Sequence, residues 1–471
     1  MLTIHDQGHH LCDGITRREW LRAGSLGLVG LSLPALWQSQ RAAAAGPDRV
    51  FGRAKSCIVL FLLGGPPQHE TWDPKPEALA EIRGDLKPIP SRVPGLLVGE
   101  LMPRVAALTD QIAVLRAVST HDNAHSSSGY WMLTGRPHQP MNSENSKPGA
   151  PNDWPCLGAV VKHLHRTQHR HTASLPAAIT LPEQIWNTGK IVWPGQNAGW
   201  LGRTADPWLL TCDPSAPNYQ IPELGLPADV PPLRLQERRS LLDQVNHHLD
   251  RLDRSGAVSR FNTLAQQAFD LLRSPKARRA FALHEEPEAV RDRYGRNRFG
   301  QSVLLARRLV EAGVPLVQVN WTRMPGDTND SPAWDTHAKN AQRLKTALMP
   351  VMDRAYSALL DDLAARGLLE QTLVAWMGEF GRSPKINRAG GRDHWGHVFS
   401  VALAGGGVRG GVVHGASDRI AGQPKDGRVQ PQDITATIFH CLGYRPETEI
   451  HDPFGRPFPI SNGEVIRQVL A

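Results

Sequence analysis

Short apolar runs recur along the chain and predict buried strands. They occupy residues 56–63, 110–119, 314–321, 372–377 and 399–408. A continuous apolar run of this length, bounded by glycine, proline or polar residues, is typical of a strand that is covered on both faces. We therefore expect these segments to form the core of one central sheet.

Helical periodicity separates several of these runs. Apolar residues recur every three or four positions at 233–252, 297–313 and 338–367, which predicts amphipathic helices. Pro350 is expected to kink the last of these or to divide it in two. Strand and helix then alternate, which predicts an α/β fold with a mostly parallel central sheet flanked by helices.

Residues 1–45 have the pattern of an export signal. Arg17 and Arg18 precede an apolar stretch at about 23–37, and alanines follow at 42–45. Charged, apolar and small residues in this order predict a signal peptide, and the paired arginines are typical of twin-arginine export. We expect a mature domain at 46–471, periplasmic or secreted, without a stable membrane span, because no other apolar stretch is long enough.

Composition narrows the function further. The net charge of +8 is spread without a long run of Lys or Arg, so we expect no nucleic-acid partner. The four cysteines after the signal have no CxxC spacing, which leaves both disulfides and buried thiols open. Residues 136–230 are rich in Pro, Trp, Asn and Gly with little periodicity, and we expect a loop-rich and helical insertion at about 136–290.

Acidic residues and histidines follow successive predicted strands. In open α/β sheets functional groups gather beyond the carboxyl ends of strands, and Asp, Glu and neutral His are ligands of zinc and manganese. Any one of these residues alone could be a helix cap or a hydrogen-bonded loop residue. We expect a divalent metal site with one or two ions, zinc first with manganese or calcium as alternatives, among His69, Asp73, Asp335, His337, Glu379, Asp393 and His394.

A run of serines follows the predicted strand at 110–119. Ser126 and Ser127 precede a short helical segment, GYWMLTG. A hydroxyl at a helix N-terminus beside a cation has its alkoxide stabilised, so either serine is a candidate nucleophile. Arg382 is expected to clamp an anionic substrate group. The alternative is a run of N-capping serines.

These motifs resemble a large family of twin-arginine-exported bacterial proteins with a domain of unknown function, grouped with the alkaline phosphatase and sulfatase superfamily. The resemblance runs from LFLLGGPPQHETWDPKPEA through HSSSGYWMLTG, RDRYGRNRFGQSVLLARRLVEAGV, WDTH, GEFGR and GRDHW to DPFGRPFPIS. It implies an alkaline-phosphatase-like fold with two adjacent metal ions beside an alkoxide nucleophile, acting on phosphate or sulfate esters.

The resemblance carries over to some positions and fails at others. It places the superfamily's paired acid and histidine at Asp335 and His337, and its final histidine at His394. Where the superfamily has Asp-His after the next strand, this chain has Glu379 and a phenylalanine. Where the first strand normally ends in a metal-binding Asp, this chain has Gly64 and a second glycine.

The sulfatase register also departs from the family pattern. The position of the modified cysteine falls on His125, so the chain is not expected to be a formylglycine sulfatase. We expect an exported metal-dependent hydrolase of phosphate or sulfate esters with a serine nucleophile. The alternative is a non-catalytic envelope protein on the same fold that binds sulfated or phosphorylated glycan, with loop tryptophans as stacking surfaces.

Overall fold

A computed structural model gives the structure of the chain. It describes residues 49–168, 175–221, 271, 274–324, 327–328 and 332–471. The expected signal peptide at 1–45 and the expected helix at 233–252 lie outside these residues. Val50–Ala471 form one unit.

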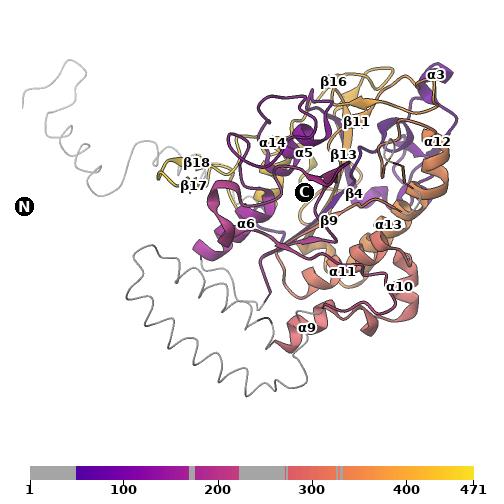
Figure 1. Ribbon diagram of the computed structural model, residues 1–471. Helices are drawn as coiled ribbons and strands as arrows, with labels where there is room; N and C mark the ends of the chain where they lie inside the picture. Colours follow the sequence, from indigo (N-terminus) through magenta and orange to yellow (C-terminus); the bar gives the residue numbers. More distant parts are fainter. Residues whose placement is uncertain (1–48, 169–174, 222–270, 272–273, 325–326, 329–331) are drawn as a thin grey trace, which may run out of the picture. The chain divides into compact units, whose positions relative to one another are not determined.

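The central sheet has eight strands within the described residues, in the order β14-β4-β13-β10-β1-β9-β5-β8. Figure 1 labels β4, β9 and β13 of this sheet. All pairs are parallel except those of β13, which runs antiparallel to both β10 and β4. The predicted α/β fold with a mostly parallel sheet is confirmed. In spatial order the strands are Val413–His414, Ile112–Val118, Phe399–Ala404, Thr372–Met377, Ser56–Phe61, Leu316–Asn320, Ala178–Leu181 and Trp208–Leu209.

Strands β5 and β8 were not expected, because they lie in the region taken for loops. β5 has only the four residues AITL and β8 only two, so neither produces a run that stands out in the sequence. Parallel pairing with β9 buries β5 completely. The helix α6 (Leu157–Thr167) lies in the same region. Part of the expected insertion therefore completes the sheet.

Helices cover the sheet where periodicity predicted them. α11 (Arg298–Glu311) begins after Asn297, whose side chain accepts a hydrogen bond from the backbone N–H of Gly300. The last predicted helix is divided into α12 (Asn340–Arg343), a π-helical turn at Leu344–Leu348 and α13 (Met349–Ala365). Pro350 lies in the first turn of α13, where a missing N–H costs least.

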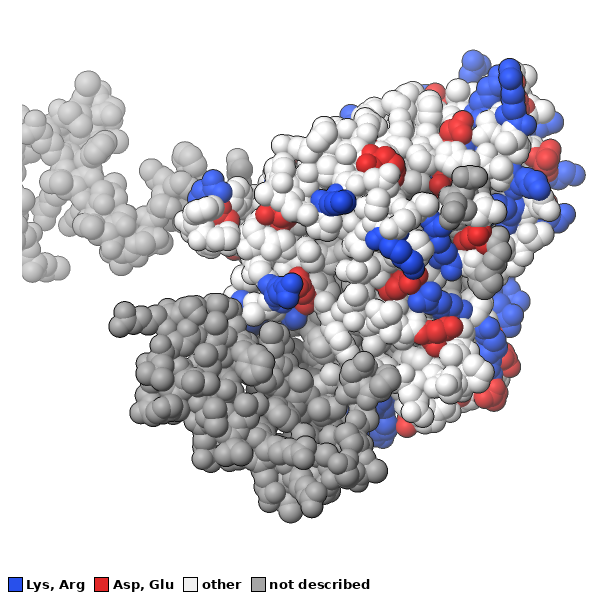
Figure 2. Space-filling view, viewed as in Figure 1, with Lys and Arg blue, Asp and Glu red and all other residues white. Residues whose placement is uncertain are grey.

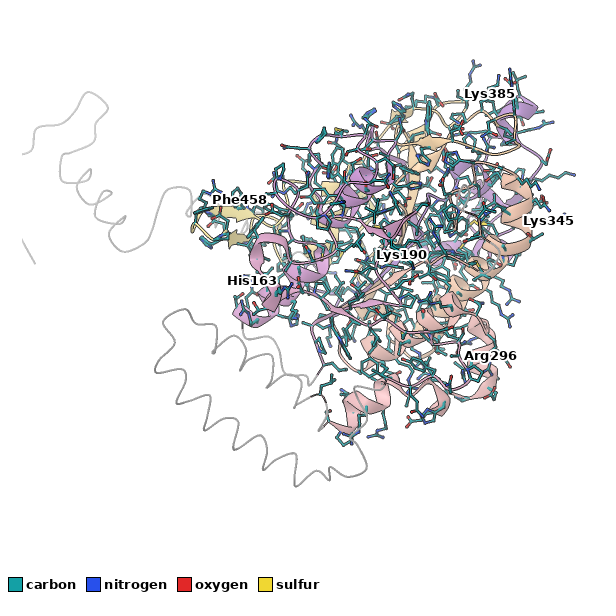
Figure 3. All side chains as sticks on the ribbon, viewed as in Figure 1. His163, Lys190, Arg296, Lys345, Lys385 and Phe458 are labelled. Atoms are coloured by element: carbon teal, nitrogen blue, oxygen red, sulfur yellow. The ribbon has the colours of Figure 1, made fainter. Side chains whose placement is uncertain are left out.

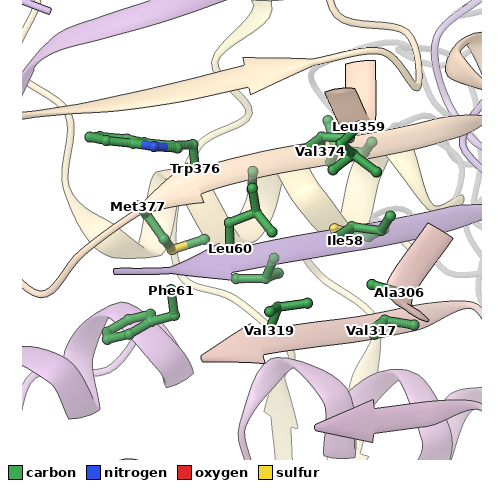
Figure 4. Close-up of a cluster of buried hydrophobic side chains, with 14 of the residues drawn as sticks. Ile58, Leu60, Phe61, Ala306, Val317, Val319, Leu359, Val374, Trp376 and Met377 are labelled. Atoms are coloured by element: carbon green, nitrogen blue, oxygen red, sulfur yellow. The ribbon is translucent and has the colours of Figure 1, made fainter. Parts of the chain in front are cut away.

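The core lies on both faces of the sheet. Figure 4 shows Leu60 and Phe61 of β1 pointing to opposite faces, as neighbouring residues of a strand must. Ala306 of α11 and Leu359 of α13 pack with the aliphatic side chains near Ile58 (Figure 4). Phe61 contacts Trp193 edge-on, with ring centroids 6.4 Å apart. All of these side chains are buried, which fixes the strand ends that carry the site.

The remaining elements are short. The helices are α3 (Ala80–Arg83), α4 (Pro103–Ala106), α5 (His125–Thr134), α9 (Pro275–Phe281), α10 (Glu288–Tyr294) and α14 (Pro431–Cys441). The two-residue and three-residue strands are Pro88–Pro90, Leu97–Gly99, Trp186–Asn187, Ile191–Val192, Gly381–Arg382, His394–Trp395, Ala416–Ser417, Pro424–Asp426, Glu449–His451 and Pro457–Pro459, numbered β2, β3, β6, β7, β11, β12 and β15–β18.

The surface agrees with the even charge distribution of the sequence. Lys and Arg are scattered among Asp and Glu on the face in Figure 2, and are most frequent toward the side that carries α3 and α12. Among the described residues, no helix combines the length and apolar character that crossing a bilayer requires. Cys57 and Cys156 are buried thiols rather than disulfides.

Candidate metal centre

The candidate site lies beyond the carboxyl ends of the parallel strands. β9 is followed by Asp335 and His337, and β10 by Glu379. β4 runs in the same direction as β10, since β13 is antiparallel to both, and it is followed by His125 at the start of α5. His394 enters on the short strand β12. The topology therefore brings three separate segments, which follow β4, β9 and β10, to one edge.

Three side chains form a group that could hold a metal ion. The ligand atoms of His125, Asp335 and His394 all lie within 4.8 Å of one another. The Nε2 atom of His125 is 3.1 Å from Asp335 Oδ2, and that of His394 is 3.1 Å from Asp335 Oδ1. A tetrahedral zinc ion with bonds of 2.0–2.1 Å holds its ligands about 3.3–3.4 Å apart, so these spacings fit a zinc-sized cation.

His337 extends the group on the Oδ1 side of Asp335. Its Nε2 atom lies 3.0 Å from Asp335 Oδ1 and 2.9 Å from Nε2 of His394. The three imidazoles thus direct Nε2 at one carboxylate. The expected convergence of Asp335, His337 and His394 is present in the structure, with His125 as a fourth member.

Each of these histidines is held by its other ring nitrogen. Nδ1 of His125 lies 2.7 Å from Glu379 Oε1, Nδ1 of His337 lies 3.2 Å from Asp393 Oδ1, and Nδ1 of His394 lies 2.7 Å from the carbonyl oxygen of Asn123. A carbonyl only accepts, so His394 carries a proton on Nδ1 and a neutral ring presents a lone pair at Nε2. Metal-binding histidines have this arrangement, in which an oxygen acceptor fixes the tautomer.

The electrostatics of the group are strongly coupled. Although burial opposes it, the charge of Arg382 and then that of His125 hold the pKa of Asp335 well below its usual range. Burial also opposes charging of His125, but the charge of Asp335 and hydrogen bonds to Asp335 and Glu379 raise the pKa of His125 to about 10. Burial and the neighbouring His125 lower the pKa of His394 to about 4. The carboxylate of Asp335 is the fixed negative centre.

Glu379 and Asp393 support the ligands instead of joining them. Glu379 is fully buried, and its Oε1 accepts hydrogen bonds from His125 Nδ1 and from the backbone N–H of Gly64 at 2.8 Å. Asp393 contacts the ring of His337 and the side-chain amide of Asn387. Their expected role as direct ligands is corrected to that of orienting carboxylates, because an imidazole lies between each of them and Asp335.

Gly64 explains why the first strand ends in glycine. Its φ is +107°, and a Cβ there would lie 2.3 Å from the backbone nitrogen of Asp335. The backbone of β1 thus passes directly against the Asp335 loop, in a conformation that L side chains rarely adopt. The segment after β1 therefore brings backbone, and no side chain, against Asp335 at Gly64.

Arg382 cannot clamp a substrate as expected. Its side chain is completely buried, and its guanidinium contacts Asp335 Oδ1 together with the backbone carbonyls of Gly64, Gly65 and Arg392. Every nitrogen is engaged inside the protein. Arg382 fixes the position and charge of Asp335 instead.

The serine hydroxyls are also engaged elsewhere. Ser126 and Ser127 are fully buried. Ser126 Oγ donates to the carbonyl of Ser143 at 2.9 Å, and Ser127 Oγ donates to Asp122 Oδ1 at 2.8 Å. These contacts do not support either serine as the expected nucleophile. His125, the first residue of the same helix, faces the centre in their place.

His69 and Asp73 do not reach the centre. His69 Nε2 lies 2.8 Å from the carbonyl of Ile420, and burial keeps the pKa of His69 well below its usual value. Asp73 accepts a hydrogen bond from Ser417 and pairs with Lys75 at 3.0 Å. Both expected ligands instead fix the chain around β15 and β16, which the sequence spacing could not reveal.

A cavity of about 240 Å³ opens onto the centre. Glu144 and Arg323 line it, and neither was among the expected site residues. The β6–β7 hairpin forms one wall, and its turn residue Lys190 lies near the middle of the face in Figure 3. The lining residues are Leu63, Gly64, His125, Glu144, Asn145, Trp186, Asn187, Thr188, Arg323, Pro332, Asp335 and His394.

Fold and site together define an α/β protein with a candidate His and Asp metal centre at the carboxyl edge of its sheet. Residues 54–470 match the family described as "Protein of unknown function (DUF1501)", and the chain belongs to that family. No curated protein matches the chain.

Several solved structures are similar in general topology. One called "Ps i-CgsB" has 12% sequence identity and a TM-score of 0.39, covering 82% of this chain and 72% of its own. The PsFucS1 sulfatase from Pseudoalteromonas sp. has 12% identity and a TM-score of 0.37, covering 83% and 68%. An alkaline phosphatase superfamily protein from Vibrio parahaemolyticus has 9% identity and a TM-score of 0.33, covering 84% and 67%. Scores this low carry no argument about activity.

Proposed function

We propose that this protein binds a divalent cation through His125, Asp335 and His394, with His337 beside them, and that it hydrolyses a phosphate or sulfate ester. The observation that carries the proposal is the set of anchored imidazoles, each holding Nδ1 on an oxygen and directing Nε2 at Asp335. The carbonyl of Asn123 fixes the tautomer of His394, and the carboxylates of Glu379 and Asp393 fix the ring orientations of His125 and His337, as oxygen acceptors do for metal-binding histidines.

The donor set fits zinc. Imidazole nitrogens and one carboxylate oxygen are the ligands of catalytic zinc sites. A neutral His394 directs its Nε2 lone pair at a carboxylate oxygen, and His394 and Asp335 would both hold the cation. When bound, such a cation supplies Lewis acidity that polarises an ester and activates water. The residues around it orient the ligands and exclude bulk solvent.

The residues that line the cavity support the proposal that the substrate is an anion. Arg323 lines it, with NH2 3.1 Å from Thr188 Oγ1 and the guanidinium carbon 4.7 Å from the ring centroid of Trp186. A guanidinium held in this way presents a fixed positive charge to a phosphate or sulfate group. Arg323 therefore takes the substrate-binding role that the sequence suggested for Arg382.

Metal analysis with a matched pair of variants tests this proposal. His394→Ala should bind zinc at least about 100-fold more weakly and abolish turnover of an aryl phosphate or aryl sulfate. His397→Ala, three residues along the same loop, should retain wild-type metal content. If purified wild-type protein binds no zinc, manganese or calcium, or binds it equally after His394→Ala, the metal centre is wrong. Metal binding without turnover would favour the non-catalytic alternative.

We also propose that residues 1–45 direct the folded chain through the twin-arginine pathway to the periplasm. The paired arginines ahead of a short apolar stretch support this. Replacement of Arg17 and Arg18 by lysine should leave unprocessed protein in the cytoplasm, as measured by fractionation and mass of the N-terminus. Normal cleavage and periplasmic recovery of that variant would contradict the proposal.

A further inference from the structure

The loop at 142–146 lies across the N-terminus of α5 and carries a carboxylate into the cavity. Glu144 Oε2 accepts a hydrogen bond from the backbone N–H of His125 at 2.7 Å, and Glu144 Oε1 accepts one from the side-chain amide of Asn187. Glu144 lines the same cavity as His125, Asp335 and His394. Its side chain is nevertheless exposed, so a substrate or a water molecule can reach it.

The buried serines hold this loop in place. Ser126 Oγ accepts a hydrogen bond from the backbone N–H of Ser146 at 2.9 Å and donates to the carbonyl of Ser143. Ser127 Oγ accepts one from the backbone N–H of Ser143 at 3.0 Å. The serine run that suggested a nucleophile therefore fixes Ser143 and Ser146, which lie before and after Glu144 in the loop. This arrangement determines where the carboxylate lies.

We propose that Glu144 is the proton-accepting catalytic residue of the site, and that the attacking group is water. This inference rests on the proposed hydrolase function. With Ser126 and Ser127 engaged, the described cavity offers no hydroxyl nucleophile beyond Thr188, which contacts Arg323. A carboxylate has about four lone-pair positions. The backbone N–H of His125 and the side-chain amide of Asn187 occupy two of them and orient Glu144, so the remaining lone pairs can accept a proton. A positioned general base contributes about 10²–10⁴-fold to a rate.

The proposed step balances as a simple hydrolysis. The oxygen of one water molecule forms a bond to phosphorus or sulfur while one of its protons passes to the Glu144 carboxylate. The ester bond to the leaving oxygen breaks with its electron pair. The leaving oxygen takes up one proton. When the Glu144 carboxyl group donates this proton, Glu144 returns to its charged form. The products are an alcohol and inorganic phosphate or sulfate.

Turnover of the zinc-loaded enzyme gives one test. Glu144→Gln should lower kcat by about 100-fold or more at constant metal content. Glu144→Ala should recover activity when formate is added. Glu449→Gln, an exposed glutamate on β17, should behave as wild type. Ser126→Ala should lower kcat only partly, because the loop loosens while the base remains.

Binding of inorganic phosphate gives a readout that does not depend on turnover. If Glu144 faces the substrate position, Glu144→Gln should tighten phosphate binding about fivefold, since one nearby negative charge is removed. Calorimetry on both the zinc-loaded and the metal-free protein measures this.

The inference is overturned if Glu144→Gln changes neither kcat nor phosphate affinity and only lowers stability, since Glu144 would then merely cap α5. Complete loss of activity in Ser126→Ala with a normal Glu144→Gln would restore the serine nucleophile. Absence of bound metal in the wild type is a separate result and refutes the proposed function.

Discussion

At the scale of single residues, the site depends on how each side chain is held. Asp335 is the centre of the group, and it is fixed from behind by Arg382 and from the side by the backbone of Gly64. Neither neighbour needs to touch a substrate. Both determine whether the imidazoles meet a carboxylate in the right place.

Gly64 gives a direct test of this. Gly64→Ala should lower the free energy of unfolding by about 2–4 kcal/mol and weaken metal binding, because its Cβ would overlap the Asp335 backbone in a positive-φ conformation. Gly95 also has a positive φ, +81°, but a Cβ there meets nothing within 4 Å. Gly95→Ala should therefore cost only about 1–2 kcal/mol and leave metal binding unchanged. Equal effects in denaturant titrations would show that the close approach is unimportant.

The structure brings together part of the set of site residues that the sequence predicted. Asp335, His337 and His394 could be predicted because each follows a strand signal, and parallel strands deliver such residues to one edge. His125 was noted beside the serines but not assigned as a ligand, although its position in the polar segment after a strand was a usable signal. Glu144 gave none, since its place depends on hydrogen bonds that Ser126 and Ser127 make with a loop without periodicity, Ser126 Oγ as donor to Ser143 and Ser127 Oγ as acceptor from it.

At the scale of elements, α11 and α13 are joined by buried charges. The side chain of Arg307 in α11 is completely buried. It pairs with Asp362 of α13 at 3.0 Å and with Glu286 at 2.8 Å. Burial opposes ionisation of Asp362, but hydrogen bonding to Arg366 and the charge of Arg307 lower its pKa. Burial also opposes ionisation of Glu286, and the charge of Arg307 lowers its pKa. These contacts tie together the helices that cover one face of the sheet.

Asp362→Asn should lower the free energy of unfolding at pH 7 by about 3–5 kcal/mol, because Arg307 then lies buried with one partner fewer. Since the pKa of the Asp362 carboxyl is lowered on folding, its contribution is fully present above its ordinary value of 3.8 and is lost as the pH falls through the lower folded value. The difference between wild type and variant should therefore shrink in acid. Asp361→Asn, an exposed neighbour on the same helix, is the control. A difference that stays constant down to pH 2 would contradict the assignment.

The strands were predictable to different degrees for a physical reason. β1 and β10 lie in the middle of the sheet and need long apolar runs to fill both faces, so they were visible in the sequence. β5 and β8 lie toward one edge and have four and two residues. Short edge strands take their conformation from the neighbour they pair with, and their own residues carry little signal.

At the scale of the whole molecule, a bound cation should stabilise the entire fold. Its proposed ligands come from the segments after β4, β9 and β11, so unfolding any of these releases the ion. Chelation should lower the thermal midpoint by about 3 °C or more, and zinc should restore it. The His394→Ala variant should show no such shift. A wild-type midpoint that is indifferent to both chelator and zinc would argue against occupancy of the centre.

The wide separation of these ligands along the sequence has a consequence for how the protein is made. No fragment that stops short of β12 contains the full set, so a partly synthesised chain has nowhere to keep the ion. A cation at the proposed centre would therefore be loaded only after β12 has been made. The compartment where folding ends, rather than the affinity of the ligands alone, would then decide which metal occupies the proposed centre.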